Sequence, residues 1–191
     1  MSSGREYSEG RLKELVLYLA CASETADPGF GMVKLNKLLY RADFEAFRRL
    51  GHSLTGETYQ KQAYGPVARH LLIVLDDLAR EGRIAGWAHV PAGPHIRKVP
   101  QVSERADDQP DITVFDASER EIIEATLAEF AAYGAKDVSE WAHHESVGWN
   151  EVEEGQPIPY HSAFFSMEPI PEEDVERARQ LARERGWSTV P

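Results

Sequence analysis

The stretch KLNKLLYRADFEAFRRLG, residues 34–51, predicts the helix around which the rest of the chain is built. At about 100° per residue, its apolar side chains fall on two separate arcs of a helical wheel. The first arc is aliphatic, with Leu35, Leu38, Leu39, Ala42, Ala46 and Leu50, and the second is aromatic, with Tyr40, Phe44 and Phe47. An ordinary surface helix carries one apolar stripe, so two arcs predict a buried central helix over residues 34–50. Gly51 follows where a left-handed cap residue is expected.

A narrow basic stripe separates the two apolar arcs and consists of Lys34, Lys37, Arg41 and Arg48. The arcs are needed for packing against neighbouring elements. The stripe is therefore the face that we expect the helix to offer to solvent or to a partner, and we predict partner contacts at all four residues.

The bulk composition narrows the class of protein. A chain of 191 residues is expected to form a single domain, here residues 1–191. Its net charge of −11 disfavours nucleic-acid binding, because the phosphate backbone repels acidic proteins, and suits a basic protein partner. The single cysteine, Cys21, cannot form an intramolecular disulfide, and its place in an apolar helix predicts a buried, inert thiol. Residues 1–10 are polar and no apolar run reaches a membrane-spanning length, so we expect a cytoplasmic protein and no membrane contact.

Helical periodicity dominates the remainder of the chain. Helices are predicted over residues 9–24, 67–79, 116–134, 138–146 and 171–185, with capping boxes at Asp116, Ser118 and Asp137. Pro66 is expected in the first turn of the 67–79 helix, which reads as well buried. Turn chemistry marks residues 25–31, and residues 59–63 read as extended. Prolines interrupt residues 83–115, where the apolar pieces 84–90, 96–102 and 112–115 predict two or three short strands, with a flexible loop at 103–110. The fold class is mainly α with a small β element.

The residues leave three functional alternatives to consider: DNA binding, metal-dependent hydrolysis and protein binding through aromatic side chains. Residues 64–102 permit a winged-helix DNA-binding unit, in which the basic stripe or Arg69 and His70 would face DNA. A metal-dependent hydrolase would need a site built from His143 or His144 with Glu145 and His161, although the H-E-x-x-H spacing is absent. Trp141, Trp149 and Tyr160 fit either core packing or a partner-binding surface. No phosphate-binding loop or nucleophile turn occurs, so we expect no enzyme activity, no cofactor and no metal.

Three landmarks in this order and spacing resemble the Panacea domain, the SocA-like antitoxin family that includes phage-associated GepA-like proteins. They are KLNKLLYRADFEAFRRLGHSLTG (34–56), QAYGPVARHL (62–71) and VSEWAHHESVGW (138–149). The matching positions are Lys34, Leu35, Lys37, Leu38, Leu39, Tyr40, Tyr64, Gly65, Pro66, Val67, Val138, Ser139, His143 and Trp149. Trp141 and Ala142 stand where the family usually has a small hydroxyl residue, and Ile170 to Asp174 fits a terminal family piece.

The resemblance covers roughly residues 9–180 and implies a mainly helical antitoxin that neutralises a toxin encoded nearby by direct contact. One branch of the family is similar to an adaptor that delivers its toxin to a ClpXP-type protease. The resemblance also implies a common core at about 9–82 and 116–180, with residues 83–115 as a variable element. It makes Tyr40, Gly65, Pro66 and Val67 motif residues of the scaffold. Trp141 and Trp149, as aromatic residues of an irregular region, and Tyr64 and His143, at motif positions, complete the predicted partner contacts. Specificity for the toxin is expected in residues 83–115 and in the C-terminal helix.

Overall fold

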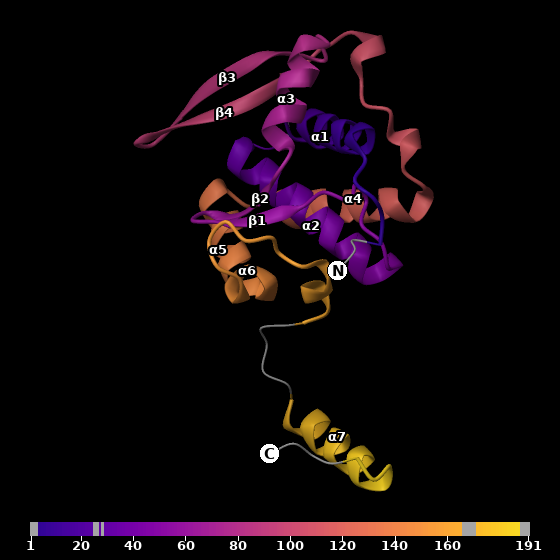
Figure 1. Ribbon diagram of the computed structural model, residues 1–191. Coiled ribbons are helices and arrows are strands. Elements are labelled where there is room, and N and C mark those ends of the chain that lie inside the picture. Colours follow the sequence, from indigo (N-terminus) through magenta and orange to yellow (C-terminus); the bar gives the residue numbers. More distant parts are fainter. Residues whose placement is uncertain (1–3, 25–26, 28, 166–170, 188–191) are drawn as a thin grey trace.

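The computed structural model describes residues 4–24, 27, 29–165 and 171–187 of the chain (Figure 1). The fold is mainly α with a small β element, as predicted. The α-helices are α1 (Glu9–Glu24), α2 (Met32–Leu50), α3 (Leu71–Arg80), α4 (Ala117–Phe130), α5 (Ala135–Glu145), α6 (Val147–Glu151) and α7 (Glu172–Glu184). Two antiparallel hairpins pair β1 (Tyr59–Gln62) with β2 (Gly65–Ala68), and β3 (Ile84–Ala92) with β4 (His95–Val102). Short 3-10 turns are η1 (Ala106–Asp108), η2 (Ile112–Val114) and η3 (Tyr160–Phe164).

Helix α2 lies at the centre of the domain, as its two apolar arcs predict (Figure 1). It contacts α1, α4, α5, β2, β4 and η3, so elements from both halves of the chain pack around it. The aliphatic arc is buried at Leu35, Leu38 and Leu39, and Phe44 of the aromatic arc stacks on Tyr160 of η3 at 4.5 Å. Gly51 adopts φ 79° and donates its N–H to the carbonyl oxygen of Phe47, which confirms the left-handed cap.

The YGPV segment is a strand, and the prediction that it starts a helix is wrong. Gly65 and Pro66 open β2, in which Pro66 lies opposite Lys61 of β1, and α3 begins only at Leu71. A proline lacks the amide that a sheet ladder would use, and it is tolerated here because β2 is an edge strand of a two-stranded ribbon. The extended conformation predicted at residues 59–63 is confirmed as β1.

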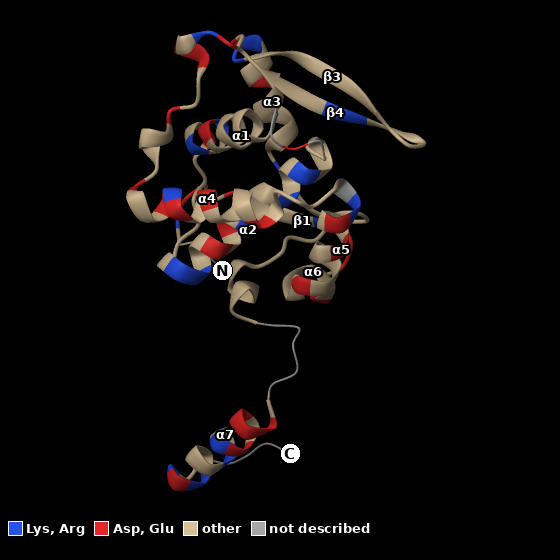
Figure 2. Ribbon diagram, turned by 180° about the vertical axis from the view of Figure 1, so that it is seen from behind, with Lys and Arg blue, Asp and Glu red and all other residues tan. Residues whose placement is uncertain are grey.

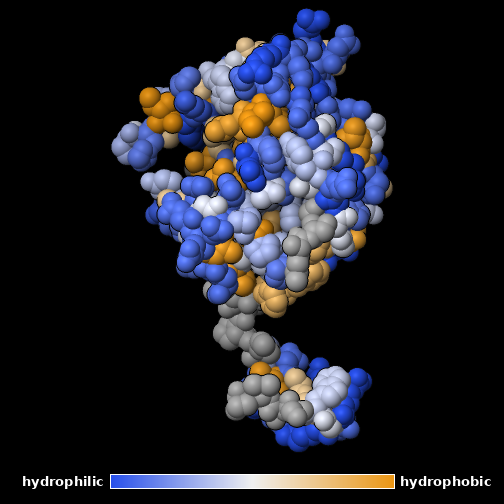
Figure 3. Space-filling model, viewed as in Figure 1, coloured by the Kyte–Doolittle hydropathy of each residue, from blue (hydrophilic) through white to orange (hydrophobic). Residues whose placement is uncertain are grey.

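Helix α3 is less buried than its sequence indicates. Its inner face packs through Leu71, Val74, Leu75 and Leu78, whereas Leu72 and Ile73 are 73% and 60% exposed. Figure 3 shows apolar residues gathered on this face of the molecule, around α3 and on the β3–β4 hairpin. The prediction of a well-buried helix is therefore wrong for its first turn.

The region 83–115 contains two strands, the lower of the two or three predicted, and they pair as one long hairpin. The predicted strands at 84–90 and 96–102 are confirmed as β3 and β4, but the piece at 112–115 is the 3-10 turn η2. The predicted loop at 103–110 contains η1, and the Ser103 hydroxyl donates a 2.6 Å hydrogen bond to Asp108 beside it.

The C-terminal helices begin close to where the sequence predicts. Asp116 and Glu119 form the expected capping box of α4, which ends at Phe130, before the predicted stop at Gly134. Helix α5 starts at Ala135, three residues before the predicted start at 138. Asp137 is therefore not its N-cap. It lies in the first turn and accepts a 2.8 Å hydrogen bond from the amide of the N-cap residue Gly134. The predicted helix at 171–185 is confirmed as α7, although the family-like piece at Ile170 begins outside the described residues.

Two further expectations concern single segments. Cys21 is exposed on α1, so the prediction of a buried thiol is wrong.

Turn chemistry at residues 25–31 is confirmed where the structure describes it, because Asp27 accepts a 2.8 Å hydrogen bond from the Gly29 amide. Residues 25, 26 and 28 lie outside the described part. In the described part of the chain, the helices are all too short or too polar to cross a membrane.

Candidate partner-binding surface

The polar side chains of α2 hold the surrounding elements in place. Lys34 is 1% exposed, and its Nζ donates hydrogen bonds of 2.6 Å and 2.5 Å to the carbonyl oxygens of Phe130 and Tyr133. The same ammonium group forms an ion pair with Asp27. Lys34 thereby satisfies carbonyl groups at the C-terminal end of α4, where a helix favours positive charge.

Lys37 is buried beneath the β1–β2 turn. It is 2% exposed, and its Nζ lies 3.5 Å from the carbonyl oxygen of Pro66, a long hydrogen bond. Burial lowers the pKa of Lys37 from 10.5 to about 8. Gly65 has φ +104°, and a Cβ atom there would lie 2.7 Å from Lys37 Cε, so the turn and this lysine fit only without a side chain at position 65.

Three further polar residues of α2 share one face of the helix at a spacing of four and three residues. The side-chain oxygen of Asn36 accepts a 3.0 Å hydrogen bond from the Ala68 amide in β2, and the Tyr40 hydroxyl lies 2.6 Å from the Ser146 hydroxyl. Asp43 accepts hydrogen bonds from the Thr55 amide and hydroxyl and from the Tyr59 hydroxyl. Burial raises the pKa of Asp43 to about 6 despite these donors.

The predicted exposed stripe is therefore wrong for its first half. Lys34 and Lys37 are interior residues, and only Arg41 and Arg48 of the four lie at the surface, both paired with Glu45. Sequence reasoning also missed Asn36 and Asp43. Their i, i+7 spacing with Tyr40 between them is the signal for polar groups on a buried face.

A groove of about 260 Å³ opens beside the exposed half of the stripe. Its walls come from α2, α4, α5 and the η3 segment, which are far apart in the sequence. Arg41, Arg48 and Trp141, three of the predicted partner contacts, line it together with Phe44 and Phe165. The structure thus brings these three side chains to one site.

Charge and aromatic surface are interleaved in this groove. The Arg41 guanidinium bonds Glu129 at 2.9 Å and Glu45 at 3.1 Å, and its Cζ lies 5.8 Å from the Trp141 ring centroid. Burial opposes the ionisation of Glu45, but hydrogen bonding from Arg48 and the charges of both arginines outweigh it and hold its pKa below the usual value. The carboxylate therefore stays charged throughout the neutral range.

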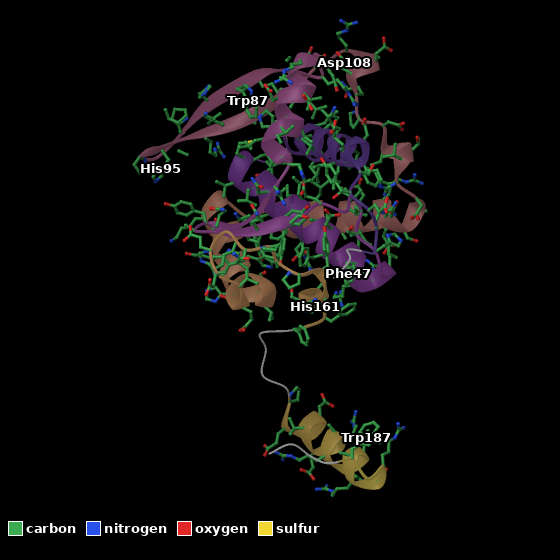
Figure 4. The ribbon with its side chains drawn as sticks, in the orientation of Figure 1. Phe47, Trp87, His95, Asp108, His161 and Trp187 are labelled. Atoms are coloured by element: carbon green, nitrogen blue, oxygen red, sulfur yellow. The ribbon has the colours of Figure 1, made fainter. Side chains whose placement is uncertain are left out.

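Two exposed aromatic side chains lie at the end of η3, and the second of them, Phe165, lines the groove. Phe47 of α2 packs 5.6 Å from Phe164, and Figure 4 shows Phe47 near His161, at the end of the domain from which the chain leads to α7. Phe164 and Phe165 are 60% and 61% exposed. Adjacent exposed phenylalanines are unusual on a non-interacting surface and are typical of the centre of a protein interface.

The other predicted contacts lie together at a second place, beside the β1–β2 turn. His143 stacks on Trp149 at 4.4 Å, and Lys61 lies 4.5 Å from the centre of the same indole ring. The Trp149 indole donates a 3.2 Å hydrogen bond to the Gln62 carbonyl oxygen, which holds it against the hairpin. Tyr64 projects from the turn and is 77% exposed. Tyr160, the third member of the aromatic group, is buried and belongs to the core.

The residues proposed for a metal site do not assemble one. Among the described residues, no group of three or more histidine, cysteine, aspartate or glutamate side chains could hold a metal ion. His143 instead stacks on Trp149, and its Nε2 is buried with no hydrogen-bond partner in the described part of the structure.

The winged-helix alternative has the right succession of elements but little basic surface. α3 is followed directly by the β3–β4 hairpin, and β4 carries Arg97 and Lys98, blue in Figure 2. Lys34 and Lys37 cannot face DNA because they are buried, and His70 is bonded to Glu57. Arg80 of α3 is paired with Asp76 and Asp77 of the same helix.

A buried central helix, a β1–β2 ribbon packed on Lys37 and a groove of mixed charge and aromatic character together characterise a mainly helical domain. The family model described as "Antitoxin SocA-like, Panacea domain" matches residues 35–150, which is more than half of the chain. The chain therefore belongs to the SocA-like Panacea-domain antitoxin family. Comparisons with curated proteins and with solved structures gave no match.

Proposed function

We propose that this protein is a cytoplasmic antitoxin that binds the product of a neighbouring gene and neutralises its toxicity by direct contact. The observation that carries the proposal is the family match over residues 35–150, because the family is named for its antitoxins. The protein acts in this account by binding and not by catalysis.

The charge of the chain supports a basic toxin as the partner. A net charge of −11 gives long-range attraction to a basic protein and repulsion from nucleic acid. Association with such a partner speeds up at low ionic strength and slows as salt screens the attraction. A toxin that acts on nucleic acid or nucleotides would itself carry the basic surface that this antitoxin meets.

The exposed aromatic and charged groups around the groove supply the kind of surface that such binding needs. Phe164 and Phe165 offer apolar area, and Arg41, Arg48 and Trp141 are of the residue types that dominate interface energies.

Delivery of the toxin to a ClpXP-type protease is a further part of the proposal, drawn from the resemblance to one branch of the family. It is separable from neutralisation. If the protein is an adaptor, the toxin's half-life in cells lengthens when the protease is deleted. A half-life that is the same with and without the protease limits the protein to a binding role.

The test of the main proposal is co-expression with the adjacent short reading frame. That reading frame is expected to stop growth when expressed alone and to be tolerated when this protein is expressed with it. Failure of this protein to restore growth, at levels where both proteins accumulate, would reject the antitoxin assignment.

A further inference from the structure

The groove beside α2 is already built to hold a guanidinium group. Arg41 bonds the carboxylates of Glu129 and Glu45 simultaneously and lies over the Trp141 ring. Carboxylates satisfy the N–H groups of a guanidinium, and an indole face attracts its positive charge. One wall of the groove therefore shows, with a residue of the chain itself, how this site accommodates a cation.

The groove also contains more carboxylates than arginines, so one of its carboxylates is left without an ion pair among the described residues. Its charged lining residues are two arginines, Arg41 and Arg48, and three carboxylates, Glu45, Glu129 and Glu145, which leaves one negative charge in excess. Glu45 and Glu129 are engaged with the arginines, whereas Glu145 is exposed and forms no ion pair in the described part of the structure.

Glu145 and Trp141 occupy the same face of α5, because they are four residues apart on one helix. Both line the groove. A cation entering the groove can therefore meet the indole ring and the Glu145 carboxylate together, the same two kinds of group that Arg41 already contacts.

We propose that this groove receives an arginine or lysine side chain of the bound protein. The inference rests on the proposed function and adds the chemistry of the contact: a basic side chain of the toxin lies between Trp141 and Glu145. The exposed ring of Phe165 lines the site, and exposed Phe164 precedes it in the chain; together they exclude water once the partner is bound, which strengthens the charge pairing inside.

A small cationic probe tests the site without the toxin. The full chain, labelled with ¹⁵N, is titrated with N-acetyl-arginine amide and, as a neutral match of the same shape, with N-acetyl-citrulline amide. The arginine compound is expected to shift the indole N–H signal of Trp141 saturably, and the citrulline compound is not. The signal is assigned from the spectrum of Trp141→Phe.

Two matched variants locate the binding. Glu145→Gln is expected to weaken binding of the arginine probe about threefold, the size of one exposed ion pair, with no change in the thermal melt. Glu154→Gln, which removes another exposed carboxylate that does not line the groove, is expected to leave binding unchanged. Equal shifts with the citrulline compound, or equal effects of the two variants, would overturn the proposal.

The same variants separate this inference from the antitoxin assignment. In the growth assay, Glu145→Lys places a cation where the toxin's cation would bind, and it is expected to weaken rescue while Glu154→Lys does not. Full rescue by Glu145→Lys overturns the groove as the contact and leaves the antitoxin role standing. If the wild-type protein fails to restore growth, the antitoxin role is rejected. The cation site is then accepted or rejected from the titration with the arginine probe alone.

Discussion

Lys34 and Lys37 are three residues apart on α2 and have the same side chain, yet their surroundings differ in kind. Lys34 meets two carbonyl oxygens and the carboxylate of Asp27, whereas Lys37 has one long hydrogen bond to Pro66. A wheel diagram places both between apolar arcs but cannot show that other elements close over them. Their burial depends on where α4 and the β1–β2 turn pack, which local periodicity does not contain.

Replacing Lys34 by methionine is expected to lower the free energy of unfolding by about 3–5 kcal/mol, because it leaves the largely buried Asp27 carboxylate without its partner. Urea denaturation measures the change. Lys136→Met is the matched control, since Lys136 is 86% exposed and its pair with Glu140 is worth under about 1 kcal/mol. Similar losses in the two variants would show that the buried ion pair of Lys34 does not stabilise the domain.

Replacing Lys37 by methionine is expected to raise the free energy of unfolding at neutral pH, whereas replacing Lys34 lowers it, and the gain is expected to depend on pH. The folded-state pKa is about 8 and the unfolded-state value 10.5, so the unfolded chain binds more protons between these values. The wild-type protein consequently gains stability relative to the variant as the pH rises from 8 to 10.5. At neutral pH the buried charge costs up to roughly 3 kcal/mol, and Lys37→Met is expected to be the more stable protein.

Urea denaturation of both proteins near pH 7 and near pH 10 checks this sign. A stability difference that stays constant across that interval would mean that Lys37 keeps an ordinary pKa in the folded protein.

At the scale of elements, the sequence predicts helices better than it predicts their starts. The periodic segments that became α1, α2, α4 and α7 are found where expected, because an amphipathic pattern with caps is a local signal. The YGPV segment misleads because proline suits a first helical turn equally well. Its strand is selected by contacts from α2: Asn36 accepts from the Ala68 amide and Lys37 lies against Gly65.

Tertiary packing also limits how much of the candidate site can be predicted from the sequence. Arg41, Arg48 and Trp141 are recognisable as partner-binding residue types, and the structure brings them to one groove. Glu129 and Phe165 complete that groove from α4 and from the end of η3, and nothing in the spacing of the sequence connects them to α2.

Gly65→Ala is expected to lower the free energy of unfolding by about 2 kcal/mol or more, since a Cβ would both strain a backbone at φ +104° and displace Lys37. In a Lys37→Ala background the same change is expected to cost only the backbone strain, about 1 kcal/mol. A double-mutant cycle in urea measures the coupling. Additive effects would contradict the close fit between the turn and the lysine.

Tyr64→Ala, in the same turn, is expected to change stability by less than about 0.5 kcal/mol, because the side chain is 77% exposed. A larger loss in thermal or urea denaturation would mean that the Tyr64 ring packs on the domain.

At the scale of the whole molecule, α7 stands apart from the helical domain (Figure 1). None of its residues is buried, and its apolar side chains form a thin stripe among charges. A solitary helix of 13 residues is only marginally stable in water. The domain's stability must therefore come from the elements that surround α2.

Deleting residues 166–191 is expected to leave the thermal midpoint of the domain unchanged within experimental error, since α7 buries no side chain against it. Thermal denaturation of the full and shortened chains compares them. A marked fall in the midpoint would mean that α7 packs on the domain in solution.

The central claim is that this protein neutralises its neighbour's product by contact, and isothermal titration of the two purified proteins tests it most directly. We expect saturable binding that weakens as salt is raised, because a chain of net charge −11 meets a basic partner. An absence of binding heat and of any complex on size exclusion, with a toxin that is active in cells, would contradict neutralisation by direct contact.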